Sequence, residues 1–240
     1  MKKLFIGIIS LLLAVTLTAC GGKTERDDKT LLVAATSKPH GDILEEAKNI
    51  LKDDYDIDLE IKILDDYYIF NRSLNDGDVD ANFFQHQPYL DEFAAEHSVK
   101  LVSAGGVHIE PMGIYSKKVK ALDELKDGAL VAIPNDPTNG GRALILMAKA
   151  GIITLKDNND IKATVQDVVA NPKNIQFQEV EAAQLPRVLD DVDAAVINTN
   201  YAMQAGFVPA SDALIIEDST SPYVNIVAVR EGDQEKPAIQ

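Results

Sequence analysis

Cysteine and tryptophan are nearly missing from this sequence of 240 residues, which has one cysteine, Cys20, and no tryptophan. A single cysteine excludes an internal disulfide and a cysteine-based metal site, so a folded domain here must rely on its hydrophobic core. The four histidines are scattered, without the close pair that zinc motifs use: His40, His86, His97 and His108. The spacing therefore predicts no metal site, although distant histidines can still meet in a fold.

Basic side chains are also scarce, with 23 lysines and arginines against 38 acidic residues and a net charge of −15. Such an acidic chain is repelled by nucleic acid and by anionic lipid headgroups, so we expect neither as a partner. The acidic residues are dispersed, which is typical of a solvated surface. The sequence contains no Gly-x-Ser-x-Gly elbow and no other visible catalytic nucleophile. We expect no enzymatic activity and no cofactor.

Only one long apolar run is present, residues 4–17, and it is shorter than the roughly 20 residues that a membrane-spanning helix needs. Lys2 and Lys3 precede it, and small residues lead to Cys20, as in a bacterial lipobox. We predict a signal peptide at residues 1–19, an acylated anchor at Cys20 and a polar tether at 20–29. An ordinary secretory signal is the alternative. The predicted location is the extracytoplasmic face of a cell membrane.

The remaining chain alternates between short apolar runs and segments with helical spacing. This alternation predicts an α/β fold with mostly parallel sheets, and the number of strands favours two lobes with a ligand cleft between them. Another helix begins near Pro237, so we expect the domain to continue past Gln240. The predicted strands are 31–35, 58–64, 79–84, 130–134, 175–180, 194–197, 213–217 and 223–229, and the predicted helices 41–51, 88–95, 142–150 and 185–189.

The loop at residues 135–141 is the most informative segment, because it joins a predicted strand to a helix that begins at Arg142. Backbone N–H groups and the positive end of a helix dipole make such a loop an anion site. The guanidinium of Arg142 adds a planar fork that matches a carboxylate. The Gly-Lys-Ser/Thr ending of a phosphate-binding loop is absent. The alternative is a capped helix with an arginine that faces solvent.

Aromatic and amide side chains form a second group of candidates. Phe84 and His86 share one face of a predicted strand, and with Tyr67 they make a wall suited to a small apolar side chain with a sulfur atom. A packed core is the competing interpretation of these aromatics. Asn198 follows the strand at 194–197, where its amide can both donate to and accept from a zwitterion. A simple turn would also explain an asparagine there.

Five longer motifs resemble the NlpA-type lipoprotein family, whose members include methionine-binding receptors of ABC importers. The resemblance covers about residues 31–230. It implies a two-lobed, type II-like periplasmic-binding-protein fold, with residues 30–112 and 203–240 in one lobe and 113–202 in the other. The motifs are DANFFQH (80–86), EPMGIYS (110–116), VAIPNDPTNGGR (131–142), EAAQLPR (181–187) and SPYVN (221–225).

The resemblance also implies a role for each site residue. Arg142, helped by Asn139, would bind the carboxylate of the ligand, and Asn198 and Asn225 would hold its head group. Tyr67, Phe84 and His86 would line the thioether pocket, with Tyr89, Asn200 and Tyr201 as further candidates. The implied function is binding of methionine, L-methionine first, and delivery to an ABC permease and ATPase complex.

Three alternatives stay open. Lys38 and Phe70 depart from the glycine and proline common in the family, so the ligand could instead be D-methionine or a methionine-containing dipeptide. A surface lipoprotein with an adhesive role is the alternative from another functional class.

Overall fold

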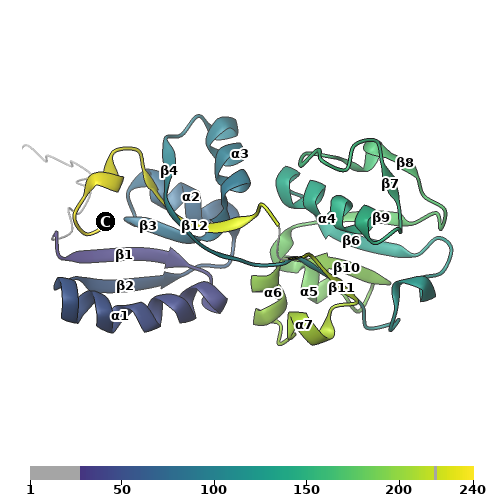
Figure 1. Cartoon of the computed structure of the whole chain (residues 1–240), viewed down its shortest axis with the longest axis horizontal. Coiled ribbons are helices and arrows are strands. Elements are labelled where there is room, and N and C mark those ends of the chain that lie inside the picture. Colours follow the sequence, from purple (N-terminus) through teal and green to yellow (C-terminus); the bar gives the residue numbers. More distant parts are fainter. Residues whose placement is uncertain (1–27, 219–220) are drawn as a thin grey trace, which may run out of the picture.

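The computed structural model describes residues 28–218 and 221–240, and there the chain forms two α/β lobes that lie side by side (Figure 1). The predicted signal peptide, Cys20 and most of the tether lie outside these residues. Each lobe is built on a five-stranded sheet with helices packed on it. Within the described part of the chain, no helix is long and apolar enough to cross a membrane.

The first lobe has strand order β2-β1-β3-β12-β4, in which β1 is parallel to β2 and β3 while β12 is antiparallel to β3 and β4. Helix α1 packs on one face of this sheet, and α2 and α3 pack on the other. The strands are β1 (Thr30–Ala35), β2 (Asp58–Ile63), β3 (Ala81–His86), β4 (Leu101–Ile109) and β12 (Val224–Arg230), and the helices are α1 (Asp42–Tyr55), α2 (Tyr67–Asp76) and α3 (Gln87–His97).

The second lobe has strand order β11-β5-β10-β6-β9, with β10, β6 and β9 parallel and β5 antiparallel to both β10 and β11. A two-stranded sheet, β7 (Thr154–Leu155) and β8 (Val168–Ala170), extends it. The other strands are β5 (Gly113–Tyr115), β6 (Leu130–Pro134), β9 (Gln176–Val180), β10 (Ala194–Ile197) and β11 (Ile215–Ile216), and the helices are α4 (Pro137–Lys149), α5 (Leu185–Val188), α6 (Thr199–Gln204) and α7 (Pro209–Asp212).

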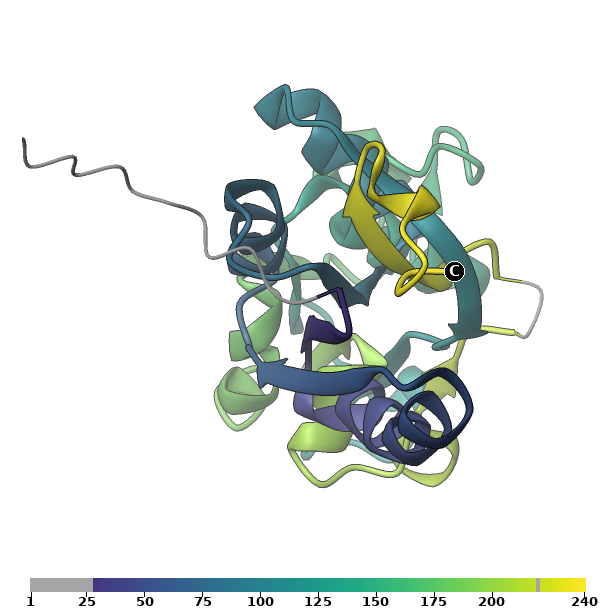
Figure 2. The same cartoon turned by 90° about the vertical axis from the view of Figure 1, so that its left-hand side faces the viewer.

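Burial of strand β3 on both faces explains its continuous apolar and aromatic character. All six of its residues are buried. Side chains alternate across a strand, so Phe83 packs with Val33 and Leu59 beneath α1, whereas Phe84 packs with Phe70 beneath α2. After β12 the chain folds back beside β4 through the turn η5 (Asp233–Glu235), as the end-on view of this lobe shows (Figure 2).

Two segments cross between the lobes, one between β4 and β5 and one between β11 and β12 (Figure 1). The first lies close to the predicted lobe boundary at residue 112. The second lies later than predicted, since β11 pairs with β5 and residues up to Ile216 therefore accompany the second sheet. Our assignment of residues 203–216 to the first lobe was wrong, because an apolar run does not reveal which of two sheets it will join.

Helix α4 begins at Pro137, five residues before the predicted start at Arg142. The Asp136 carboxylate accepts a hydrogen bond from the Asn139 backbone N–H at 2.9 Å, and Pro137 occupies the first helical position, where proline is well tolerated. The glycine pair that suggested a loop lies inside the helix. A Cβ at Gly140 would approach the Pro134 carbonyl oxygen to 2.9 Å, and one at Gly141 the Ile161 carbonyl carbon to 2.8 Å. These glycines permit close backbone packing.

We predict that Gly141→Ala destabilises the protein by about 1–3 kcal/mol, as overpacking of a rigid interior does, even though alanine is the better helix former. Urea unfolding followed by circular dichroism measures the change. Gly105→Ala is the matched control, because a Cβ at this exposed strand position meets nothing within 4 Å. Equal stability of the two variants would contradict the packing explanation.

Candidate ligand-binding site

One narrow cavity at the junction of the lobes is lined by all seven predicted ligand-binding residues. Its free volume is only about 20 Å³, little more than a single water molecule needs, so a ligand of amino-acid size fits only when the cavity widens. A wider groove beside it shares Tyr67 and Tyr89. The cavity lining comprises Tyr67, Phe84, Gln85, His86, Tyr89, Glu110, Asn139, Arg142, Asn198, Thr199, Asn200 and Asn225.

Arg142 projects from α4 and binds both crossing segments. Its Nε donates to the Glu217 carboxylate at 2.9 Å, and its Nη2 donates to the Glu110 carbonyl oxygen at 2.7 Å. The guanidinium also lies 4.2 Å from the centre of the Tyr223 ring. Only Nη1 donates no hydrogen bond to a described residue. The sequence suggested that the whole guanidinium is available to a ligand. In the structure, its edge formed by Nε and Nη2 binds Glu217.

His86 ends strand β3 and caps helix α3. Its Nδ1 accepts from the Tyr89 backbone N–H at 3.2 Å, so the ring proton is on Nε2, which donates to Asn139 Oδ1 at 3.1 Å across the lobe junction. Burial, and secondly the positive charge of Arg142, lowers the pKa of His86 to about 3. The imidazole is therefore a neutral donor at physiological pH.

Both ends of the Asn139 amide bind protein groups. Oδ1 accepts from His86 and, at 2.8 Å, from Asn198 Nδ2, while Nδ2 donates to both oxygens of Asp136 at 3.0 Å. Burial raises the pKa of Asp136, opposed by these hydrogen bonds from Asn139. Asn139 thus fixes the orientation of Asn198. The Asn198 Oδ1 is buried and accepts no hydrogen bond from the described residues.

The aromatic wall comes from both lobes. Tyr67 donates from its hydroxyl to Asn200 Oδ1 at 2.6 Å, and its ring lies 5.3 Å from Phe84 and 4.9 Å from Tyr201. Phe70, one of the departures from the family pattern, stacks on Phe84 with ring centres 4.1 Å apart. Phe70 therefore supports the wall from behind. The Nδ2 of Asn200 is buried and has no acceptor among the described residues.

A cluster of two imidazoles and a carboxylate adjoins the cavity through Glu110. Glu110 Oε1 lies 2.7 Å from His108 Nε2 and 3.1 Å from His40 Nε2, and the latter atom is also 3.1 Å from Asn225 Oδ1. The three groups meet within 4.8 Å and have donor types that a transition metal accepts. Their short contacts to one oxygen fit a hydrogen-bonded cluster equally well. Burial lowers the pKa of His40, whose Nε2 faces two acceptor oxygens and so carries the proton.

Sequence reasoning missed Glu110, Gln85 and Thr199 as cavity residues. Glu110 follows β4, a strand that we did not predict, although it opens one of the family motifs. Gln85 sits between Phe84 and His86 on β3, and the side chains of Asn71 and Asn82 hold its amide. The signal in the sequence that could have indicated such residues is a strand with a buried, apolar pattern that nevertheless carries polar residues.

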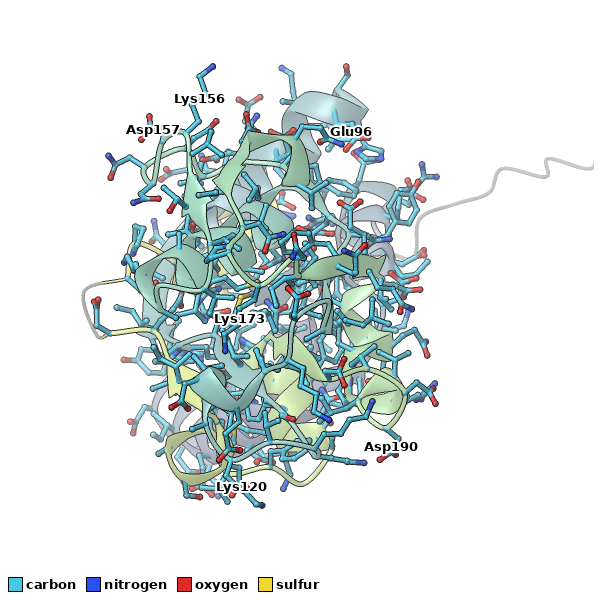
Figure 3. The ribbon with its side chains drawn as sticks, turned by 90° about the vertical axis from the view of Figure 1, so that its right-hand side faces the viewer. Glu96, Lys120, Lys156, Asp157, Lys173 and Asp190 are labelled. Carbon is cyan, nitrogen blue, oxygen red and sulfur yellow. The ribbon has the colours of Figure 1, made fainter. Side chains whose placement is uncertain are left out.

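Charged side chains of both signs are interspersed on the far end of the second lobe (Figure 3). Lys120, Lys156, Asp157 and Asp190 point outward there, and the Lys173 ammonium donates to the Asp123 and Leu125 carbonyl oxygens at 2.6 and 2.8 Å. The acidic residues on this face are dispersed, in line with the solvated surface that composition predicted.

We predict that His86 makes stability depend on pH. An imidazole with a pKa near 6.5 when unfolded and about 3 when folded binds a proton on unfolding, so stability falls as the pH drops from about 6.5 toward 3. The slope from one group is at most about 1.4 kcal/mol per pH unit. His86→Gln should flatten the pH dependence of urea unfolding between pH 6.5 and 5. Any pH-independent loss of stability that the substitution causes is measured above pH 7. The same pH dependence of stability in the variant and in the wild-type protein would contradict the role given to His86.

The D-methionine-binding lipoprotein MetQ of Escherichia coli strain K12 is 45% identical over 235 residues, which cover 97% of this chain and 86% of that protein. The crystal structure of the methionine binding protein MetQ matches with a TM-score of 0.86 and 46% identity, over 89% of this chain and 88% of that one. A nutrient binding protein from Burkholderia cenocepacia bound to methionine matches with a TM-score of 0.84 and 44% identity, over 87% and 88% of the two chains.

The fold is shared as well, since a periplasmic substrate-binding protein of an ABC transporter from Coxiella burnetii has a TM-score of 0.84 with 46% identity. The expected two-lobed periplasmic-binding-protein fold is thereby confirmed. A family model for the NlpA lipoprotein matches residues 31–240. This chain belongs to the NlpA lipoprotein family.

Proposed function

We propose that this protein is a methionine receptor that delivers its ligand to an ABC importer and does not transform it chemically. The observation that carries the proposal is the pattern of unmet polar groups in the cavity. Among the described residues that line the cavity, two buried amide atoms lack partners: the acceptor Asn198 Oδ1 and the donor Asn200 Nδ2. A buried polar group left unpaired costs about 1–3 kcal/mol, so a ligand that pairs both is selected strongly.

The head group of an amino acid supplies the matching atoms. Its carboxylate would accept from Arg142 Nη1 and from the Asn200 amide, and its ammonium would donate to Asn198 Oδ1. Asn225, which His40 orients through a contact of 3.1 Å, completes the head-group site. Asn139 acts through its neighbours, because its own amide is fully engaged by Asp136, His86 and Asn198.

The aromatic wall suits the thioether side chain. Tyr67, Phe84 and Tyr89 are in contact with one another and line the cavity, and sulfur packs favourably against such rings. Discrimination by this pocket is modest, because one methylene contributes only about 1–3 kcal/mol. L-Methionine is the first candidate, and D-methionine and a methionine-containing dipeptide are the ligands to compare with it. The two MetQ proteins and the Burkholderia cenocepacia protein are described as binding D-methionine or methionine.

Isothermal titration tests the function directly. Protein stripped of ligand by partial unfolding and refolded should bind L-methionine more tightly than leucine, and titration with D-methionine and glycyl-methionine ranks the alternatives. Failure of all three methionine ligands to bind would contradict the proposal. Native mass spectrometry of protein that was never unfolded identifies any ligand retained from the cell.

We predict that Arg142→Ala lowers the affinity for methionine at least about 30-fold, because loss of one partner of a buried ionic contact typically costs about 2–5 kcal/mol. The variant also leaves the Glu217 carboxylate unpaired, so its melting temperature must be measured alongside. Arg187→Ala is the control, since Arg187 is exposed and, among the described residues, donates only to Gln184. Unchanged affinity in a folded Arg142→Ala protein would remove Arg142 from the site.

We also propose that the protein is anchored in a cell membrane by lipid on Cys20, with the domain on the extracytoplasmic face. One acyl chain binds a membrane only marginally, so stable anchoring requires more than one. The polar tether gives the receptor reach and keeps it concentrated beside its permease.

Cys20→Ser should therefore abolish incorporation of labelled palmitate and release the protein into the soluble fraction. Labelling followed by cell fractionation measures both effects. Wild-type fractionation of the Cys20→Ser protein would contradict the lipid anchor. Because Cys20 is the sole cysteine in the chain, no second thiol can carry the label.

A further inference from the structure

The two charged side chains that line the cavity differ in whether the protein balances their charge. Among the residues that line it, Arg142 is the only basic side chain and Glu110 the only acidic one. The positive charge of Arg142 is already balanced by Glu217, which lies outside the lining. Glu110 has no such partner, since neither a lysine nor an arginine side chain in the described ranges pairs with its carboxylate.

The Glu110 carboxylate is buried, with 8% of its side chain exposed. Its Oε1 faces both imidazoles of the cluster, at 2.7 Å from His108 and 3.1 Å from His40. Its Oε2 accepts no hydrogen bond from the part of the chain that the structure describes. Hydrogen bonds from two imidazoles solvate a carboxylate only in part, and a buried anion without a lysine or arginine partner is costly.

Glu110 lies next to the proposed binding site for the ligand's head group. His40 Nε2 lies 3.1 Å from both Glu110 Oε1 and Asn225 Oδ1, so the carboxylate and the Asn225 amide are neighbours around a single imidazole. Asn225 belongs to the head-group site of the proposed function. Arg142 Nη2 binds the Glu110 backbone oxygen, which fixes the strand end that carries the carboxylate.

We propose that Glu110 is the residue that recognises the charged amino group, so that the site requires a ligand with a free ammonium. This inference rests on the proposed function, because it assumes that an amino acid or a peptide with a free amino terminus occupies the cavity. Asparagine oxygens alone offer an ammonium only dipoles, whereas a carboxylate compensates its full charge in a site that excludes water. Ligands with an acylated or missing amino group would leave Glu110 unpaired.

A ligand and protein double cycle tests the proposal. Isothermal titration compares L-methionine with 4-(methylthio)butanoic acid, which lacks only the amino group, in the wild-type protein and in Glu110→Gln. The amide keeps the shape of the side chain and an oxygen for the two histidines. We expect wild type to prefer methionine at least 100-fold, and Glu110→Gln to reduce this preference at least tenfold by weakening methionine alone. N-acetylmethionine should bind neither protein.

Glu60→Gln is the matched control, because it removes the same charge from an exposed position on β2 and should leave the preference unchanged. Loss of affinity for both ligands by the same factor in Glu110→Gln, or methionine affinity within threefold of wild type, would overturn the proposal. A wild-type preference below tenfold would overturn it without any variant, even if Glu110→Gln failed to fold. Absence of binding by all methionine ligands would instead refute the proposed function on which it rests.

Discussion

The guanidinium of Arg142 is the group on which the geometry of the site depends. It joins helix α4 to both segments that cross between the lobes, through the Glu217 carboxylate in one and the Glu110 carbonyl in the other. Glu217 in turn accepts from the Met112 backbone N–H at 2.9 Å, which ties the two crossings together. A planar group with five fixed donors can hold three partners at once, and lysine could not replace it.

Most of the other hydrogen-bonding groups in the cavity are uncharged. His86 is kept uncharged by burial and by Arg142, and the amides of Asn139, Asn198 and Asn200 donate and accept without net charge. A low-dielectric site strengthens each hydrogen bond and penalises each unpaired atom. The few charged groups that remain can therefore determine the orientation of a zwitterionic ligand.

Much of this arrangement could be predicted from the sequence, and the limits have physical causes. Strand–helix alternation predicted the α/β architecture, and the family resemblance implied a set of site residues that the fold brings to one cavity. The start of α4 was misjudged because glycine usually marks a loop, whereas Gly140 and Gly141 serve close packing against Pro134 and Ile161. The predicted lobe boundary after residue 202 was wrong, because the sheet that a strand joins is decided by contacts with residues far away in the sequence.

Contacts between residues far apart in sequence were also beyond prediction. Nothing local indicates that Glu217 takes one edge of the Arg142 fork, 75 positions away. Likewise, the pairing of β12 with β4 sets Asn225 beside His108, and His40 reaches Glu110 from the segment that follows β1. Motif resemblance identified residue types at the site but not which of their atoms remain available.

The hydrogen bonds from His86 to Asn139 and from Tyr67 to Asn200 join one lobe to the other. These bonds make the exchange kinetics a property of the protein, because a ligand of amino-acid size held between the lobes cannot leave until they break. The dissociation rate is then governed by lobe opening, and ligands of different affinity can share a similar residence time. A transporter that pries the lobes apart would thus release its cargo without competing for any contact to the cargo itself.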